Sequence, residues 1–149
     1  MASYRTVLVG TDGSESSYRA VDRAAALARD AGATLVLLCA YQPLSDREKS
    51  RAAAELGEQA YQVMGSNPAE DVLRDAAARA KTAGATDVRL EPVQGDPVDQ
   101  IVASADRHGV DLVVVGNRGL HSLAGRLLGS VPANVGHRAK CDVLIVHTT

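Results

Sequence analysis

Residues 111–119 read Asp-Leu-Val-Val-Val-Gly-Asn-Arg-Gly, and this stretch decides how the chain folds. Four successive apolar residues, 112–115, are typical of a strand buried on both faces of a parallel sheet. The run ends in glycine, and Gly116, Gly119, Gly129 and Ser130 stand in the order Gly-x2-Gly-x9-Gly-Ser. We therefore expect a buried strand that leads through a glycine-rich loop into a helix.

The helix after this loop is expected to begin near Ser130. Serine is a good N-cap, and Pro132 falls in the first turn, where a missing N–H costs nothing. Backbone N–H groups at a helix N-terminus stabilise an anion. Glycine lets the main chain approach a ligand and permits positive φ. The pattern predicts a phosphate-binding site; the alternative is that the glycines only shape a surface loop.

Short apolar runs alternate with helical patterns along the chain, as is typical of a parallel α/β sheet. Three helices are expected between a capping residue or proline and a glycine, from Ser14 to Gly32, from Asn67 to Gly84 and from Asp96 to Gly109. Five strands are expected at about 6–10, 34–41, 87–93, 111–116 and 142–147. We predict one domain, 1–149, with a doubly wound, Rossmann-like sheet flanked by helices.

A second candidate site is Gly10-Thr-Asp-Gly-Ser14, at the end of the first expected strand. In a doubly wound sheet, loops that follow neighbouring strands face one crevice beyond the carboxyl ends. The Asp12 carboxylate could there accept a hydrogen bond from a ribose hydroxyl or an adenine amino group, or hold Mg²⁺ against phosphates. The alternative is that Asp12 only forms an Asx turn before the helix.

Composition narrows the function further. The 149 residues carry a net charge of −2 and no Trp or Phe, so neither a basic stripe nor an aromatic platform for nucleic acid is present. The longest apolar run, Leu35 to Tyr41, is too short to span a bilayer, and no leader pattern precedes the first strand. We expect a cytoplasmic protein in which Cys39 and Cys141 are buried free thiols.

Four stretches together resemble the nucleotide-binding branch of the universal stress protein family, and the resemblance covers essentially the whole chain. They are Val7-Leu-Val-Gly-Thr-Asp-Gly-Ser14, Gln94-Gly-Asp-Pro97, Gly116-Asn-Arg-Gly119 through Gly129-Ser130, and Cys141-Asp-Val-Leu-Ile-Val-His147. The resemblance implies a five-stranded parallel sheet in the order 3-2-1-4-5. It also implies a homodimer, expected to form through the last strand, Asp142 to His147.

The resemblance further implies an adenine nucleotide as ligand: ATP, AMP or cyclic AMP. The implied contacts are Asp12, the backbone at Gly10, Thr11 and Ala40, and the loop residues Gly116, Gly119, Gly129, Ser130 and Val131. Arg118 and Arg126 lie within the same loop and could neutralise phosphate charge.

Catalysis has little support in the sequence. The chain lacks the Gly-x4-Gly-Lys-Ser/Thr motif of P-loop enzymes, and its four histidines are scattered without an evident partner nucleophile. We therefore expect a regulatory protein that binds an adenine nucleotide in a stress response. The alternatives are a slow ATPase that uses Mg²⁺ near Asp12, and an interaction module whose pocket is unoccupied. The charged segment 42–67 is either a lid over the nucleotide or disordered.

Overall fold

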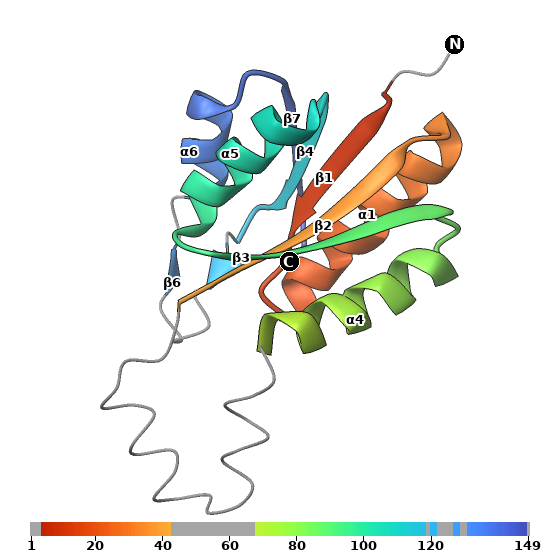
Figure 1. Cartoon of the computed structure of the whole chain (residues 1–149), viewed down its shortest axis with the longest axis horizontal. Coiled ribbons are helices and arrows are strands. Elements are labelled where there is room, and N and C mark those ends of the chain that lie inside the picture. The colour runs from red at the N-terminus through yellow and green to blue at the C-terminus, as the bar shows by residue number, and fades with distance from the viewer. Residues whose placement is uncertain (1–3, 43–67, 119, 122–126, 129–130, 149) are drawn as a thin grey trace, which may run out of the picture.

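The computed structural model describes residues 4–42, 68–118, 120–121, 127–128 and 131–148. Its centre is a parallel sheet of five strands in the order β3-β2-β1-β4-β7 (Figure 1). The strands are β1 (Thr6–Gly10), β2 (Thr34–Tyr41), β3 (Asp87–Gln94), β4 (Leu112–Gly116) and β7 (Asp142–Val146). The predicted fold class is confirmed, and each strand begins and ends within one residue of its expected position.

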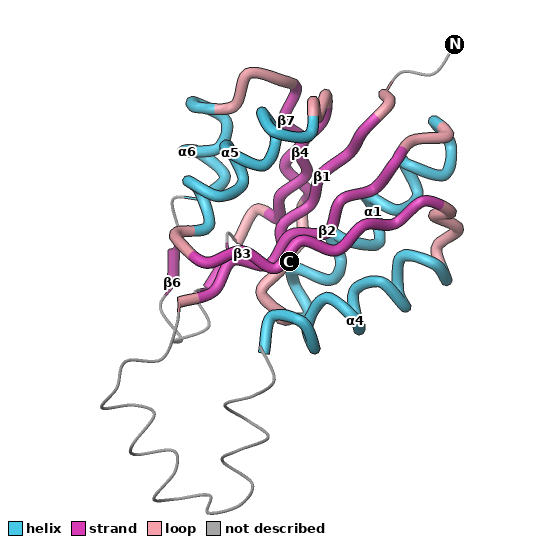
Figure 2. The backbone as a smooth tube through the Cα atoms, viewed as in Figure 1, coloured by secondary structure: helices cyan, strands magenta, loops and turns pink. Residues whose placement is uncertain are grey.

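Helices cover both faces of the sheet (Figure 2). The helices α1 (Glu15–Ala31) and α4 (Pro68–Thr82) pack on one face, and α5 (Pro97–His108) and α6 (Val131–Arg138) pack on the other. Because side chains alternate along a strand, the central strands supply both cores. Val7 and Val9 face α1, whereas Leu8 faces α5. This two-sided burial explains the continuous apolar runs in the sequence.

The ends of the helices follow from capping residues. Ser14 is the N-cap of α1, where its hydroxyl accepts a hydrogen bond from the Ser17 N–H, and Asp96 caps α5 in the same way. Gly32 and Gly109 adopt the left-handed conformation, with φ of 64° and 62°, and end these helices as expected. No helix among the described ranges is long and apolar enough to cross a membrane.

A small antiparallel pair of strands, β5 (Leu120–His121) and β6 (Leu127–Leu128), lies within the stretch that the sequence predicts as a plain glycine-rich loop. Each strand has only two residues, and a strand this short shows no alternating pattern by which the sequence could reveal it. The connection from β4 to α6 therefore contains a short two-stranded antiparallel sheet in addition to its glycines.

Candidate functional site

The β1 and β4 strands are neighbours in the sheet, and the chain changes winding direction between them. From β1 the chain proceeds to β2 and β3 on one side, whereas β4 and β7 lie on the other side (Figure 1). Val9 pairs with Val114, so both strands end at the same edge of the sheet. This is the topological switch point, where open α/β sheets bind ligands. The two glycine-containing segments of the sequence follow these two strands.

Hydroxyl groups hold the loop between β1 and α1. The buried Thr11 hydroxyl lies 2.8 Å from the Ser17 hydroxyl and accepts the Gly13 N–H at 3.2 Å. Ser17 Oγ donates to the Ser14 carbonyl at 2.9 Å and accepts the Asp12 N–H at 3.3 Å. The loop is thus fixed by short side chains at the N-terminus of α1, and the Ser17 contribution had no signal in the sequence.

The Asp12 side chain is half-buried in this loop. Its Oδ1 accepts a hydrogen bond from the Ser14 N–H at 2.9 Å, which closes an Asx turn. Gly13 has φ of +85°, a conformation that side chains rarely adopt, and a Cβ there would lie 3.0 Å from Val72 Cγ2. The turn-forming role of Asp12 is therefore confirmed, and its contact with a ligand stays a prediction.

Gly10, Thr11 and Ala40 lie at the same carboxyl edge. Gly10 pairs with Leu38 of β2, and Ala40 follows two residues further along that strand. Ala40 is 8% exposed and packs with the core on the α5 side. The Thr11 N–H donates to the Leu38 carbonyl at 2.9 Å. These residues therefore form a buried floor beside the switch point.

Gly116 ends β4, where the sequence predicts a glycine that lets the main chain approach a ligand or adopts positive φ. Its φ is not positive. Instead, a Cβ at this position would lie 3.3 Å from Thr148 Cγ2 and 4.0 Å from Ala20 Cβ. The expectation of positive φ is therefore wrong at Gly116, the C-terminal segment leaves little room for a side chain here, and close approach to a ligand stays a prediction. Asn117 and Arg118 follow as exposed residues.

The helix α6 begins at Val131, as the Ser130 cap and Pro132 predict. Both Val131 and Pro132 are buried. The predicted phosphate ligands Gly119, Gly129 and Ser130 lie outside the described residues, as do Arg126 and segment 43–67. The structure therefore brings together Gly10, Thr11, Asp12, Ala40 and Gly116 at one edge of the sheet.

No group of three or more His, Cys, Asp and Glu side chains among the described residues could hold a metal ion. Magnesium in nucleotide sites is commonly held by one or two carboxylates together with phosphates, and Asp12 would supply one carboxylate. Among the described residues, the only magnesium contact that remains is therefore the one that the sequence predicts, in which Asp12 would hold the ion together with the phosphates.

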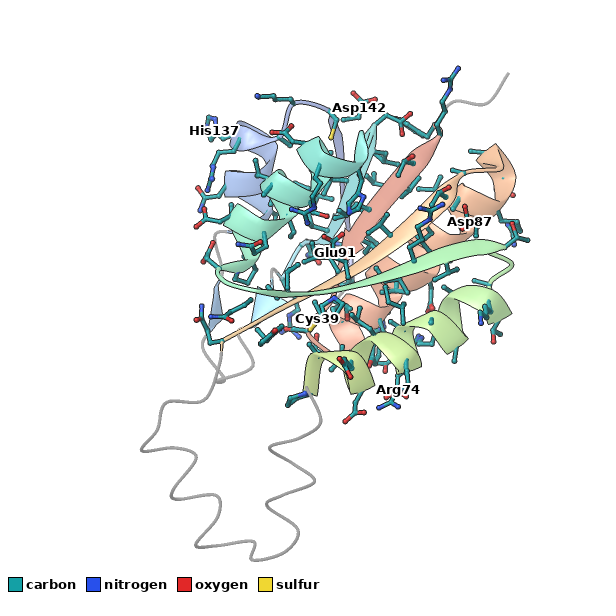
Figure 3. All side chains as sticks on the ribbon, viewed as in Figure 1. Cys39, Arg74, Asp87, Glu91, His137 and Asp142 are labelled. Atoms are coloured by element: carbon teal, nitrogen blue, oxygen red, sulfur yellow. The ribbon has the colours of Figure 1, made fainter. Side chains whose placement is uncertain are left out.

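Neither cysteine has the properties of a nucleophile. Both are free thiols, as expected; Cys39 is fully buried on the α1 side of β2 (Figure 3), whereas Cys141 is only partly buried. Burial, reinforced by the negative charge of Asp12, raises the pKa of Cys39 to about 12. Burial also raises the pKa of Cys141. Because the thiolate is the reactive form, the raised pKa values disfavour reaction of either thiol at neutral pH.

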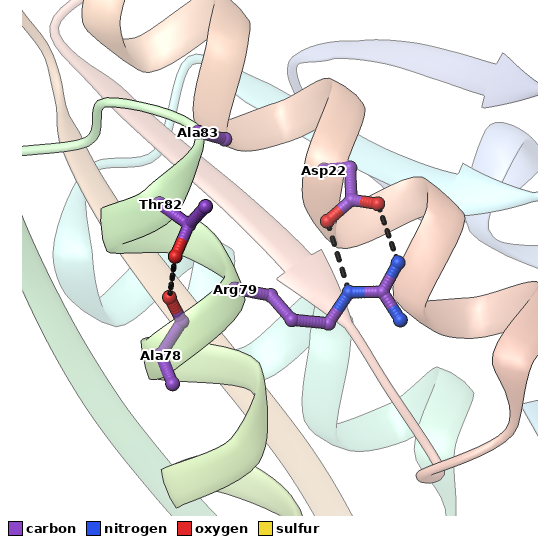
Figure 4. Close-up of a pocket in the computed structure, with 5 residues that line it drawn as sticks. All are labelled: Asp22, Ala78, Arg79, Thr82 and Ala83. Carbon is purple, nitrogen blue, oxygen red and sulfur yellow. Dashed lines mark hydrogen bonds and ion pairs between the residues drawn. The ribbon is translucent and has the colours of Figure 1, made fainter.

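A separate hollow of about 410 Å³ lies on the outer surface between α1 and α4 (Figure 4). Arg79 lies in it, with Nη2 2.6 Å from Asp22 and Nη1 3.1 Å from Glu15, and its guanidinium stacks 5.1 Å from the Tyr18 ring centre. The hydrogen bonds that Arg79 donates to Asp22 and Glu15 raise the pKa of Arg79 despite partial burial. The side chains that line this hollow thus form the ion pairs that join α1 to α4.

Comparison with known proteins gives a consistent result. The sequence pattern described as the universal stress protein family matches residues 3–147. Universal stress protein Rv1636 of Mycobacterium tuberculosis is 56% identical over 149 residues, which cover 100% of both chains. Its crystal structure superposes with a TM-score of 0.60, at 48% identity over 100% of this chain and 99% of the other. A universal stress protein crystallised in complex with cAMP superposes with a TM-score of 0.75, at 50% identity over 98% of each chain.

Proposed function

Because the chain belongs to the universal stress protein family, we propose that it is a regulatory protein that binds an adenine nucleotide, and that cyclic AMP is its ligand. One observation carries the choice of cyclic AMP: the relative that was crystallised with cAMP is 50% identical and spans 98% of both chains. The nucleotide would lie at the switch point, over the carboxyl ends of β1 and β4.

The geometry of the described residues supports this location. Gly10, Thr11 and Ala40 are small, buried residues, so no large side chain at these three positions would obstruct an adenine ring at this edge of the sheet. Because the Thr11 N–H already binds the Leu38 carbonyl, a ligand contact through the Thr11 backbone would use its carbonyl, which can accept the adenine amino group. Asp12 follows in the loop after β1, where its carboxylate would accept a hydrogen bond from a ribose hydroxyl.

The phosphate would lie at the β4 end of the site. The proposed ligands there are the backbone at Gly116 and Gly119, the Gly129-Ser130 pair and the Val131 N–H at the start of α6. A helix N-terminus carries a partial positive charge that favours an anion. Arg118 is exposed beside Gly116 and would supply the full positive charge. This arrangement would bind a phosphate through backbone N–H groups, the Ser130 hydroxyl and one guanidinium.

The test is equilibrium binding of cyclic AMP, AMP and ATP by calorimetry to the wild type and to Gly129→Val and Ser130→Ala. The valine places a branched side chain in the phosphate path, and the alanine removes a hydroxyl ligand and a helix cap. We expect the wild type to bind cyclic AMP most tightly and both variants to lose about tenfold or more in affinity. Gly136→Ala is the matched control, since a Cβ at Gly136 of α6 meets nothing within 4 Å.

Three results would contradict the proposal. Unchanged affinity in a folded Gly129→Val variant would show that the phosphate does not bind at this loop. Steady release of phosphate from ATP with magnesium, abolished by Asp12→Ala, would replace the regulatory function with a slow ATPase. If the wild type bound none of the three nucleotides, the remaining candidate function would be an interaction module with an unoccupied pocket.

A further inference from the structure

Thr148, two residues beyond β7, is 3% exposed although it lies near the end of the chain. Its N–H and its hydroxyl both donate to Asn117 Oδ1, each at 2.9 Å. Its carbonyl accepts a hydrogen bond from Arg19 Nη1 at 2.6 Å, and its hydroxyl lies 2.6 Å from Ser16 Oγ. One threonine therefore joins the loop after β4 to the first two turns of α1.

The directions of these hydrogen bonds can be assigned. A backbone N–H can only donate, so the Asn117 atom facing Thr148 must be the carbonyl oxygen of the amide. That oxygen can only accept a hydrogen bond, so the Thr148 hydroxyl donates its single proton to Asn117 Oδ1. Ser16 must then donate to Thr148. The chain of bonds runs from Ser16 through Thr148 to Asn117, and every step has one possible direction.

The same contact explains Gly116. The Thr148 methyl lies 3.3 Å from the position that a Cβ of residue 116 would take, so a side chain there would crowd it. The Asn117 N–H donates to the Val146 carbonyl at 2.8 Å, so the backbone of the loop is held to the last strand as well. The first residues of the predicted phosphate loop are thus held by the C-terminal segment, which is in turn bonded to α1 through Thr148.

We propose that the Thr148 hydroxyl is a positioning group for the phosphate end of the nucleotide site, acting through Asn117. This inference rests on the proposed function, because it concerns the loop that would bind the phosphate. Thr148 does not touch the ligand. Its hydroxyl holds the Asn117 amide oxygen, while the Asn117 N–H is bonded to the Val146 carbonyl, so the chain leaves β4 in a direction that is fixed before the nucleotide arrives.

The experiment compares cyclic AMP with adenosine, which lacks the phosphate, by calorimetry on Thr148→Val, Thr148→Ser and the wild type. Valine has the shape of threonine without the hydroxyl, and serine keeps the hydroxyl. We expect Thr148→Val to bind cyclic AMP about three- to tenfold more weakly, the equivalent of one hydrogen bond, while its affinity for adenosine is unchanged. Thr148→Ser should bind both ligands like the wild type.

Thr34→Val is the matched control. The Thr34 hydroxyl donates to Asp87 Oδ2 at 2.7 Å, so the same substitution removes one side-chain hydrogen bond, but at the amino end of β2. It should leave both affinities unchanged. In an Asn117→Ala background, adding Thr148→Val should cause no further loss, because the two groups act as one unit.

The outcomes separate the two proposals. Equal loss of cyclic AMP and adenosine in Thr148→Val would show a general structural role and overturn the positioning role. Unchanged cyclic AMP binding in a folded Thr148→Val variant would overturn it too, while leaving the proposed function intact. A wild type that binds adenosine and cyclic AMP equally would show that the phosphate contributes nothing, and would overturn the phosphate site itself.

Discussion

Asp12 combines an observed role in the fold with a proposed role in ligand binding. Its Oδ1 closes the turn onto the Ser14 N–H, and Ser14 in turn caps α1 through the Ser17 N–H. A carboxylate has about four lone-pair sites, so the turn uses only part of its capacity to accept hydrogen bonds. The proposed contact with the ribose would use another part.

Substitutions at Asp12 separate these two roles. Asp12→Asn keeps an oxygen for the turn, so we expect stability within about 0.5 kcal/mol of the wild type, whereas Asp12→Ala should lose about 1 kcal/mol. If the carboxylate binds the nucleotide, Asp12→Ala should also weaken cyclic AMP binding about tenfold or more, because hydrogen bonds to charged groups are the stronger class. Thermal unfolding and calorimetry measure the two effects. Equal affinity in Asp12→Ala and the wild type would leave Asp12 with the turn alone.

Some residues of the candidate site could be predicted from the sequence and others could not. The Asp12 turn and the Ser14 cap depend on neighbours within five residues, so local pattern reveals them. Thr148 and Asn117 are 31 residues apart, and Ser16 and Thr148 are 132 apart. Such pairs exist only because the sheet brings β1, β4 and β7 together, and no spacing in the sequence marks them.

At the scale of elements, the same distinction applies. The α1 and α5 helices end where the sequence predicts, because N-caps and left-handed glycines are local signals. The β5–β6 ribbon was missed, because two-residue strands have no period. The hydrogen-bonded cluster between β3 and α5 was missed as well, because Glu91 looks like an ordinary exposed position on an edge strand.

Glu91 is the centre of that cluster (Figure 3). Its Oε2 accepts the buried Ser104 hydroxyl at 2.8 Å and lies 2.6 Å from His108 Nε2, and its Oε1 binds Arg107. Burial acts to raise the pKa of Glu91, but the hydrogen bonds from Ser104 and Arg107 and the interaction with His108 outweigh it, so the pKa is lowered. One carboxylate therefore fastens the edge strand to three residues of α5.

The lowered pKa predicts how stability depends on pH. The charged form of Glu91 is favoured by folding, so its contribution is complete above the carboxyl pKa of the unfolded chain, about 4.3, and is lost as the pH falls through the lower folded value. We expect Glu91→Gln to be about 1 kcal/mol less stable at neutral pH, with the difference shrinking below about pH 4. Urea unfolding at several pH values measures this.

The control for Glu91→Gln is Asp30→Asn. The Asp30 carboxylate forms an ion pair with the neighbouring Arg29, 3.0 Å away, and both side chains are more than half exposed. Exposed pairs contribute little, so this variant should unfold with about the same free energy as the wild type. A difference between Glu91→Gln and the wild type that stays constant down to pH 3 would show that the Glu91 charge is not favoured by folding.

At the scale of the whole molecule, the two edges of the sheet are unlike. The β3 edge carries Pro92, which has no N–H to offer, and three charged side chains, Asp87, Arg89 and Glu91. Such residues discourage pairing with another strand. The β7 edge reads Asp-Val-Leu-Ile-Val, with a charge only at its first residue, and Ile145 is 50% exposed. An edge of this kind needs cover, and β7 is the edge where the sequence predicts it.

We predict that an identical copy supplies this cover. A two-fold axis would let β7 pair antiparallel with β7 of a second chain, so that one surface serves both subunits and the assembly closes. Light scattering should then give twice the 15.5 kDa mass of the chain at micromolar concentration. Ile145→Asp, which places a charge in the seam, should shift the mass toward that of one chain. Leu90→Asp is the matched control, since Leu90 is 45% exposed on the opposite, protected edge, and it should leave the mass unchanged. Equal effects of the two substitutions would refute a seam at β7, and a wild-type monomer would refute the dimer.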